Sequence, residues 1–165
     1  MRINKYIASA GVCSRRKADE LIANGNVKIN GEVVTHLGTD VGEYDVVEVN
    51  GRKIKSEGKK VYVAVNKPLG YITSMNDEKN RATVADLVTD IQERIFPVGR
   101  LDYNTTGLLI MTNDGDLAYR ISHPKHRIYK TYIVKAEGIV SDTKIAKLRK
   151  GVDIGGFRTS PAKVR

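Results

Sequence analysis

The chain has 165 residues, of which 41% are hydrophobic, and this fits one medium or two small folded domains and excludes wholesale disorder. Its formal net charge of +9 favours a polyanionic partner, although charge alone does not name one. The single cysteine, Cys13, excludes an intramolecular disulfide and a cysteine zinc site, which fits a reducing cytoplasm. Because Met1 leads into a polar, basic segment and no apolar run approaches about 18 residues, we expect neither a signal peptide nor a membrane span.

Two short helices are predicted at the start of the chain. Apolar residues recur at helical spacing within residues 2–10, and Ser14 is a suitable N-cap for a second helix over residues 15–24. The first turn of this second helix is basic and consists of Arg15, Arg16 and Lys17. A helix N-terminus favours anions, so this placement is explained if phosphate binds there, and a solvated basic face is the alternative.

Two β-hairpins are predicted next, because the dipeptide Asn-Gly, the strongest short hairpin signal, occurs twice between alternating segments. The turns lie at Asn30-Gly31 and Asn50-Gly51, and the strands at residues 27–29, 32–35, 45–49 and 52–55. We therefore expect a compact module over residues 1–55, followed by a polar linker at residues 56–60.

The first module is similar to an S4-type RNA-binding domain. The resemblance is carried by Arg2-Ile3-Asn4-Lys5-Tyr6-Ile7, by Ser14-Arg15-Arg16, and by Gly25-Asn26-Val27-Lys28-Ile29-Asn30-Gly31. In that family the second helix and the following strand meet RNA. The resemblance therefore implies RNA contacts from Arg2, Lys5, Arg15, Arg16, Lys17 and Lys28.

The rest of the chain alternates between strand-like and helix-like segments. Strands are predicted at residues 61–66, 71–74, 108–112 and 129–134, with a further strand beginning at residues 152–154. Helices are predicted from Thr83 to at least Thr89, around residues 117–122 up to His123-Pro124, and over residues 141–150 with Ser141 as N-cap. His123 and His126 are interpreted as surface or RNA-backbone residues, because no carboxylate or cysteine pattern supports a metal site.

The segment Phe96-Pro97-Val98-Gly99-Arg100-Leu101-Asp102-Tyr103-Asn104-Thr105-Thr106-Gly107 places a dense group of polar residues between apolar stretches. A carboxylate at the edge of a core is costly unless it is paired or hydrogen-bonded, and Arg100 lies on the same side as Asp102 if the chain is extended. A paired, ionised carboxylate in a semi-buried pocket suits a nucleophile. The alternative is a structural Arg-Asp ion pair that closes a loop beside a strand.

The string Gly-Arg-Leu-Asp-x-x-Thr-x-Gly-Leu-Leu resembles the catalytic motif of the RsuA/RluB family of ribosomal RNA pseudouridine synthases. The resemblance implies that Asp102 is the catalytic residue, that Lys67 in Lys-Pro-x-Gly helps to shape the cleft, and that Tyr132 in Lys-x-Tyr is the active-site tyrosine. Arg100 is expected to fill the space left by a flipped uridine, and Lys130, Thr105 and Thr106 to order the site. The family needs no cofactor and no metal.

The resemblance implies an α+β fold: a small S4-type αα-plus-β-hairpin domain, then a partial mixed or antiparallel-sheet synthase domain at residues 61–165. The expected partner is ribosomal RNA, with the large subunit favoured, and the expected form is a cytoplasmic monomer that does not bind membranes. The family carries a further basic motif, whose arginine pairs with the catalytic carboxylate, that is missing here. We therefore expect a domain incomplete at its C-terminus, with weak or absent turnover and retained RNA affinity. A non-catalytic RNA-binding or ribosome-assembly factor is the alternative, and a synthase that acts on tRNA is a third possibility.

Overall fold

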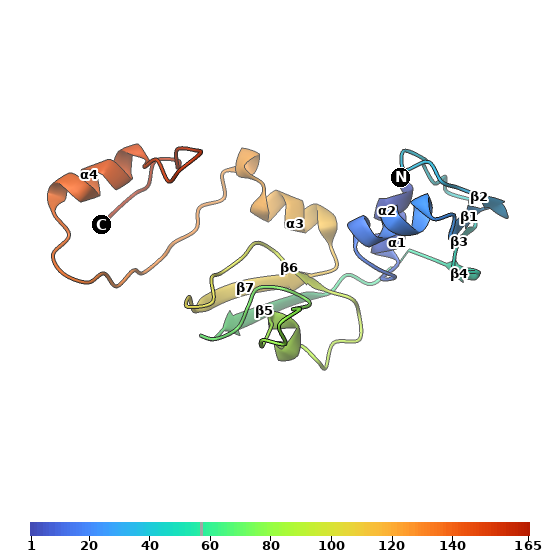
Figure 1. The fold of residues 1–165 in the computed structure, drawn as a ribbon, viewed down its shortest axis with the longest axis horizontal. Coiled ribbons are helices and arrows are strands. Elements are labelled where there is room, and N and C mark those ends of the chain that lie inside the picture. The colour runs from blue at the N-terminus through green and yellow to red at the C-terminus, as the bar shows by residue number, and fades with distance from the viewer. Residues whose placement is uncertain (57) are drawn as a thin grey trace. The chain divides into compact units, whose positions relative to one another are not determined.

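The computed structural model describes residues 1–56 and 58–165 and divides the chain into two compact units, Met1–Ile128 and Tyr129–Arg165. The chain combines helices with antiparallel sheets, so the predicted α+β class is confirmed (Figure 1). The first unit holds two hydrophobic cores, one from residues 3–54 and one from residues 61–111. The predicted linker falls between them, and its residue Glu57 lies outside the described residues. No helix in the described ranges has the length and apolar character needed to cross a bilayer.

The first core begins with the two predicted helices, α1 (Ile3–Ser9) and α2 (Arg15–Ala23). Ser14 Oγ accepts a hydrogen bond from Lys17 N at 3.2 Å, which confirms the predicted N-cap and satisfies one of the free N–H groups of the first turn. The buried faces of the two helices consist of Ile3, Ile7, Ala18 and Ile22.

Both predicted hairpins are present and form one four-stranded antiparallel sheet with the strand order β2-β1-β3-β4. The strands are β1 (Val27–Ile29), β2 (Glu32–Val33), β3 (Val47–Val49) and β4 (Arg52–Ile54). The turn residues Asn30, Gly31, Asn50 and Gly51 have φ angles of 52°, 87°, 50° and 76°. Positive φ at both central residues is the type I′ geometry that Asn-Gly favours, so the local sequence decides these turns.

The second core lies on one face of a three-stranded antiparallel sheet with the order β5-β7-β6. Its strands are β5 (Tyr62–Lys67), β6 (Phe96–Pro97) and β7 (Gly107–Thr112). Leu109 and Met111 of β7 are buried, whereas Leu108 is 70% exposed. The predicted strand at residues 108–112 is confirmed, and exposed and buried side chains occur along it because in this unit only one face of the antiparallel sheet is covered.

Between β5 and β6 the chain forms one short 3₁₀ helix, η1 (Val84–Leu87). The predicted capping box is confirmed, since Thr83 N donates to Asp86 Oδ2 at 2.7 Å, but the helix ends before Thr89. The predicted strand at residues 71–74 was wrong, because only Ile72 forms a bridge, with Thr83. A single bridge cannot extend into a ladder when the neighbouring segment turns into a helix.

After β7 the chain forms α3 (Gly115–Ser122) and the short η2 (Pro124–His126). Asp114 caps α3 by accepting from Asp116 N and Leu117 N at 3.1 Å each, which confirms a helix after the predicted turn. The helix ends immediately before His123-Pro124, as predicted, because the residue before proline is disfavoured in the α region.

The second unit contains α4 (Asp142–Lys150), as predicted, but no strands among its described residues. The predicted strand at residues 129–134 was wrong, as was the strand beginning at 152–154, where only Asp153 and Arg158 form a bridge. A strand needs a neighbour for its backbone groups, and no described strand pairs with residues 129–134, where Ile133 is 98% exposed. Ser141 precedes α4, but its side chain donates and accepts no capping hydrogen bond.

Candidate active site

Asp102 lies in the loop of residues 98–106, which connects β6 to the central strand β7. The backbone of this loop is held on both sides of Asp102 by the segment that follows β5. Thr73 Oγ1 donates to Leu101 O at 2.6 Å and accepts from Leu101 N at 3.1 Å, so one buried hydroxyl binds both backbone groups of the preceding residue. Gly70 N donates to Tyr103 O, in the following residue, at 3.0 Å.

Lys67 holds the far end of the same loop. Its side chain is fully buried, and its ammonium donates to Thr105 O at 2.8 Å and to Pro68 O at 3.0 Å. Lys67 also lies opposite Gly107 in the β5–β7 register, where the loop joins the strand. A buried ammonium is stable only when its donors are used, and here they fix carbonyl groups of both loops. The expectation that Lys67 shapes this region therefore agrees with its contacts.

The environment of the Asp102 side chain differs from the predicted one. It is exposed, and within the described residues it makes no hydrogen bond or ion pair, so the predicted semi-buried pocket and pairing with Arg100 were wrong. Thr105 N donates to Asp102 O at 3.0 Å and closes a turn that begins at Asp102. Arg100 and Thr106 are also exposed, while Thr105 is half-buried. The carboxylate is thus free to meet a ligand from solvent.

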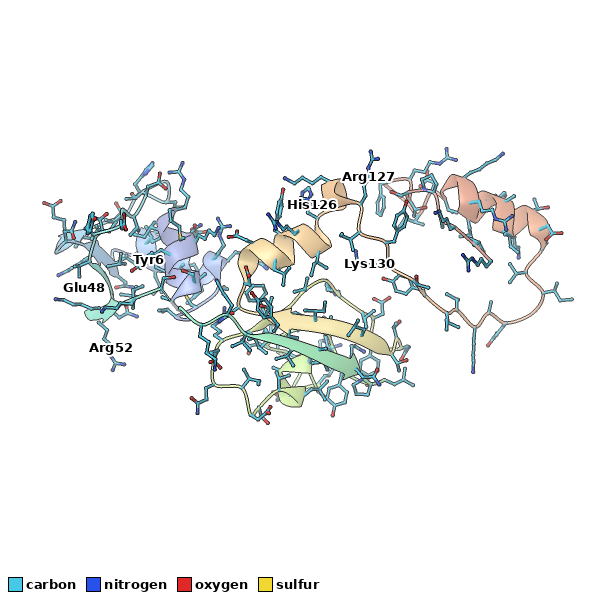
Figure 2. All side chains as sticks on the ribbon, turned by 180° about the vertical axis from the view of Figure 1, so that it is seen from behind. Tyr6, Glu48, Arg52, His126, Arg127 and Lys130 are labelled. Carbon is cyan, nitrogen blue, oxygen red and sulfur yellow. The ribbon has the colours of Figure 1, made fainter. Side chains whose placement is uncertain are left out.

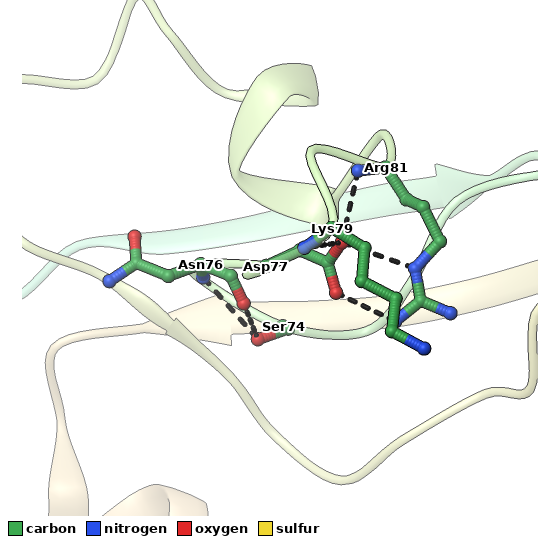
Figure 3. Close-up of polar contacts among 5 residues, drawn as sticks. All are labelled: Ser74, Asn76, Asp77, Lys79 and Arg81. Carbon is green, nitrogen blue, oxygen red and sulfur yellow. Dashed lines mark hydrogen bonds and ion pairs between the residues drawn. The ribbon is translucent and has the colours of Figure 1, made fainter.

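A second carboxylate organises the neighbouring loop of residues 74–82 (Figure 3). Asp77 accepts two hydrogen bonds from the Arg81 side chain, at 2.7 and 3.1 Å, and further bonds from Arg81 N and Lys79 N. The hydrogen bonds from Arg81 hold the pKa of the Asp77 carboxyl well below its usual range. Asp77 is therefore committed to folding its own loop, and unlike Asp102 it is not available to a substrate.

The remaining predicted site residues, Tyr132 and Lys130, belong to the second unit, Tyr129–Arg165. Both are exposed, Tyr132 by 57%. Asp102 belongs to the first unit, and a shared site of these residues with Asp102 stays a prediction. Among the described residues, no group of three histidine, cysteine or acidic side chains could hold a metal ion.

The predicted RNA-binding cations differ in how freely they can meet a phosphate. Three of them are engaged by carboxylates: Arg2 lies 3.3 Å from Asp40, Lys17 2.7 Å from Glu20, and Lys5 2.7 Å from Asp116. The hydrogen bond that Lys17 donates to Glu20 raises the pKa of Lys17. The other three are exposed: Arg15 and Arg16 at the start of α2, and Lys28 in β1. Arg15 also donates to Asn4 Oδ1 at 3.3 Å, a neutral partner that leaves its charge uncompensated.

Two family models match segments of this chain. Residues 61–162 match the family model described as RNA pseudouridylate synthase, and residues 1–47 match the S4 domain. The chain belongs to the RNA pseudouridylate synthase family. The resemblance carried by the Gly-Arg-Leu-Asp motif is thereby confirmed at the level of the family.

Named relatives of this pseudouridylate synthase support the same assignment. "Ribosomal large subunit pseudouridine synthase B" of Bacillus subtilis (strain 168) is 48% identical over 164 residues, which cover 99% of this chain and 67% of that protein. "Dual-specificity RNA pseudouridine synthase RluF" of Escherichia coli O6:H1 is 40% identical over 167 residues, which cover 100% of this chain and 57% of that protein. A solved structure entitled "Crystal structure of pseudouridylate synthase" aligns with a TM-score of 0.61 at 29% identity, over 99% of this chain and 71% of that one. The chain thus spans about two thirds of the length of the Bacillus subtilis relative.

Two further residues hold the Asp102 loop: Gly70, which the sequence analysis included only as the glycine of Lys-Pro-x-Gly, and Thr73, which it missed. Both follow Lys67 closely in the segment Lys67-Pro68-Leu69-Gly70-Tyr71-Ile72-Thr73. The spacing of Pro68 and Gly70 is the sequence signal for a turn, and Gly70 has a φ of +81°, a left-handed conformation that favours glycine. Nothing local marks Thr73, because its partner lies 28 residues further along the chain.

Proposed function

We propose that this chain converts a uridine of large-subunit ribosomal RNA to pseudouridine, with Asp102 as the nucleophile. The observation that carries the proposal is the contrast between backbone and side chain at Asp102. The backbone on either side is fixed by Thr73 and Gly70, whereas the carboxylate is exposed and makes no hydrogen bond or ion pair within the described residues. A group held in position but left unpartnered is suited to act on a bound substrate.

The reaction breaks the bond between ribose C1′ and uracil N1 and forms a bond between C1′ and C5. The C5 hydrogen is lost as a proton, so the isomerisation needs no oxidant, reductant or group donor. In this proposal the target uridine leaves its stack and enters the site. Asp102 then either attacks C1′ and displaces the base, or removes a ribose proton to give a glycal, and both routes require an ionised carboxylate.

The other site residues have supporting roles in this proposal. Arg100, exposed two residues before Asp102, fills the space left by the flipped base. Tyr132 stacks on the uracil and assists removal of the C5 proton, and Lys130 supports it. Lys67 acts through the carbonyl of Thr105, which it binds at 2.8 Å, so it is a positioning residue.

We further propose that residues 1–55 and 61–165 are the functional domains, with 56–60 as their linker. The first domain would grip ribosomal RNA through its free cations, Arg15, Arg16 and Lys28, because phosphate contacts supply most of the sequence-independent affinity. Joining two modules raises affinity for one RNA without new contacts. The proposed form is a monomer in the cytoplasm. Light scattering of the purified chain at micromolar concentration tests the monomeric state directly.

The test uses ribosomal RNA transcribed with [5-³H]uridine, because isomerisation releases the C5 tritium into water. Enzyme in excess over RNA resolves even slow single turnovers. We expect tritium release by the unaltered chain and none by Asp102→Asn, while both bind the RNA equally. Since Asp102 is exposed and unpartnered, the variant should keep its unfolding free energy to within about 0.5 kcal/mol. Release by the variant at the normal rate would contradict the role of Asp102, and no release by the unaltered chain would contradict the proposed activity and favour a chain that only binds RNA.

A further inference from the structure

A cluster of aromatic rings lies where α3 ends and η2 begins, and the proposed reaction makes no use of it. The ring centres of Tyr119 and His123 are 4.7 Å apart, and these two rings are tilted to one another. The ring centres of Tyr119 and His126 are 5.5 Å apart, and these rings are nearly perpendicular, at 87°. All three side chains are exposed. Figure 2 labels His126 and Arg127 in this region.

Tyr119 and His126 form two walls of an open cavity of about 590 Å³. This volume lies within the range of sites that hold small organic ligands. Perpendicular rings can receive a planar group face-on against one wall and edge-on against the other, the two geometries that aromatic contacts prefer. We call this cavity, with Tyr119 and His126 as its walls, the ring corner.

Two cations without a carboxylate partner line the ring corner. Arg120 and Lys125 are lining residues, and Arg127 directly follows η2; all three are exposed, and none of them lies within ion-pair distance of a carboxylate in the described part of the chain. Lys125 Nζ lies 4.7 Å from the centre of the Tyr119 ring. A polyanion with planar groups would pair with the cations and stack on the rings.

Two carboxylates also line the cavity, but each has a partner. Asp114 caps α3 through two backbone N–H groups and accepts from Tyr62 Oη at 3.0 Å, and Asp116 binds Lys5 at 2.7 Å. Only Asp116 is paired with a cation, and Asp114 keeps its negative charge because its partners are neutral, but Arg120 and Lys125 outnumber it at the ring corner.

Ordinary helix chemistry explains only part of this arrangement. Cations near a helix C-terminus interact favourably with the helix dipole, which accounts for Arg120 in the last turn of α3. It does not account for Lys125 and Arg127 beyond the helix, or for a tyrosine left 45% exposed. Partial desolvation, followed by the charges of Lys125, His123 and Arg120, lowers the pKa of His126, so its ring is neutral near pH 7 and can stack.

We infer that the ring corner binds one unpaired nucleotide of the RNA, its base packed in the open cavity against the Tyr119 and His126 rings and its phosphates on Arg120 and Lys125. Base-on-ring stacking combined with backbone cations is the usual way in which proteins hold single-stranded RNA. The inference rests on the proposed function only in taking RNA as the substrate. It adds a second anchor outside the Asp102 loop, for a nucleotide other than the target.

The first test measures fluorescence anisotropy of a labelled single-stranded oligonucleotide with the full chain. We expect His126→Ala to weaken binding about 5- to 150-fold, and His126→Phe, which keeps a planar ring, to bind normally. A loss of affinity below fivefold for His126→Ala, or an equal loss for His126→Phe, overturns the inference that the ring corner binds a nucleotide. Melting temperatures of both variants establish that the fold is intact, as expected for an exposed side chain.

The second test measures how the binding constant depends on salt. Removing two phosphate contacts with Arg120→Gln and Lys125→Gln together should lower the slope of log K against log salt by about 0.7 per contact. Lys53→Gln is the matched control, because Lys53 is exposed but lies opposite Glu48 in the β3–β4 register. An unchanged slope in the double variant, or an equal change in the control, overturns the inference.

All binding is measured in the Asp102→Asn background as well. If the ring corner is wrong, the ring and charge variants bind normally and tritium release by the parent chain is unaffected. If the proposed reaction is wrong, tritium release is absent while the variants still differ in binding. The two failures are therefore distinguishable.

Discussion

Removing the Thr73 hydroxyl should slow catalysis without weakening RNA binding. Thr73 is 8% exposed and binds both backbone groups of Leu101, the residue before Asp102, at 2.6 and 3.1 Å. Thr73→Val keeps the shape of the side chain, so it creates no cavity. It leaves one N–H and one C=O unsatisfied at a half-buried residue, which costs about 1–3 kcal/mol with partial compensation by water.

If that cost falls on the position of the Asp102 loop, the single-turnover rate should drop roughly 5- to 150-fold. Tritium release at saturating enzyme measures the rate, and anisotropy measures the affinity for the same RNA. Thr73→Ser keeps the hydroxyl and should restore most of the rate. This rescue separates hydrogen bonding from packing, since serine lacks the methyl group that valine retains.

Three results would refute the reasoning. A rate within twofold of the parent in Thr73→Val would mean that the loop holds its position without the hydroxyl. An equal loss in Thr73→Ser would assign the effect to the methyl group. A loss of RNA affinity as large as the loss of rate would show that Thr73 supports folding rather than the placement of Asp102.

The remaining predictions concern stability and pH. Because the folded state lowers the pKa of Asp77, its bonds with Arg81 stabilise the chain above the unfolded pKa of about 4 and lose effect as the pH falls below it. Urea unfolding should therefore show that Asp77→Asn is less stable than the parent at about pH 7. The difference in unfolding free energy should shrink toward about pH 3. A constant difference across this range would exclude Asp77 as the titrating group. Ser14→Ala should speed hydrogen exchange in α2 by the equivalent of about 1 kcal/mol, because Ser14 caps Lys17 N, whereas Ser141→Ala should leave α4 unchanged because Ser141 makes no such bond. Equal effects of the two serine substitutions would show that the capping bond at Ser14 contributes nothing.

Local hydrogen bonds explain which parts of the fold were predictable. The Ser14 cap joins atoms three residues apart, and the Asn30-Gly31 turn needs only the φ preferences of its own two residues. The motif at Asp102 was likewise sufficient to indicate the family. In each case the residues that decide the feature are neighbours in sequence.

The sequence by itself determined the two small helices, the two hairpins, the central strand β7 and membership of the family. Tertiary structure alone decided that Thr73 and Lys67 hold the Asp102 loop, because their partners lie 28 and 38 residues away. It also decided that residues 129–134, despite their alternating pattern, form no strand here. A strand and a backbone clamp both need a partner from a distant segment, and only the folded chain determines which segment lies beside which.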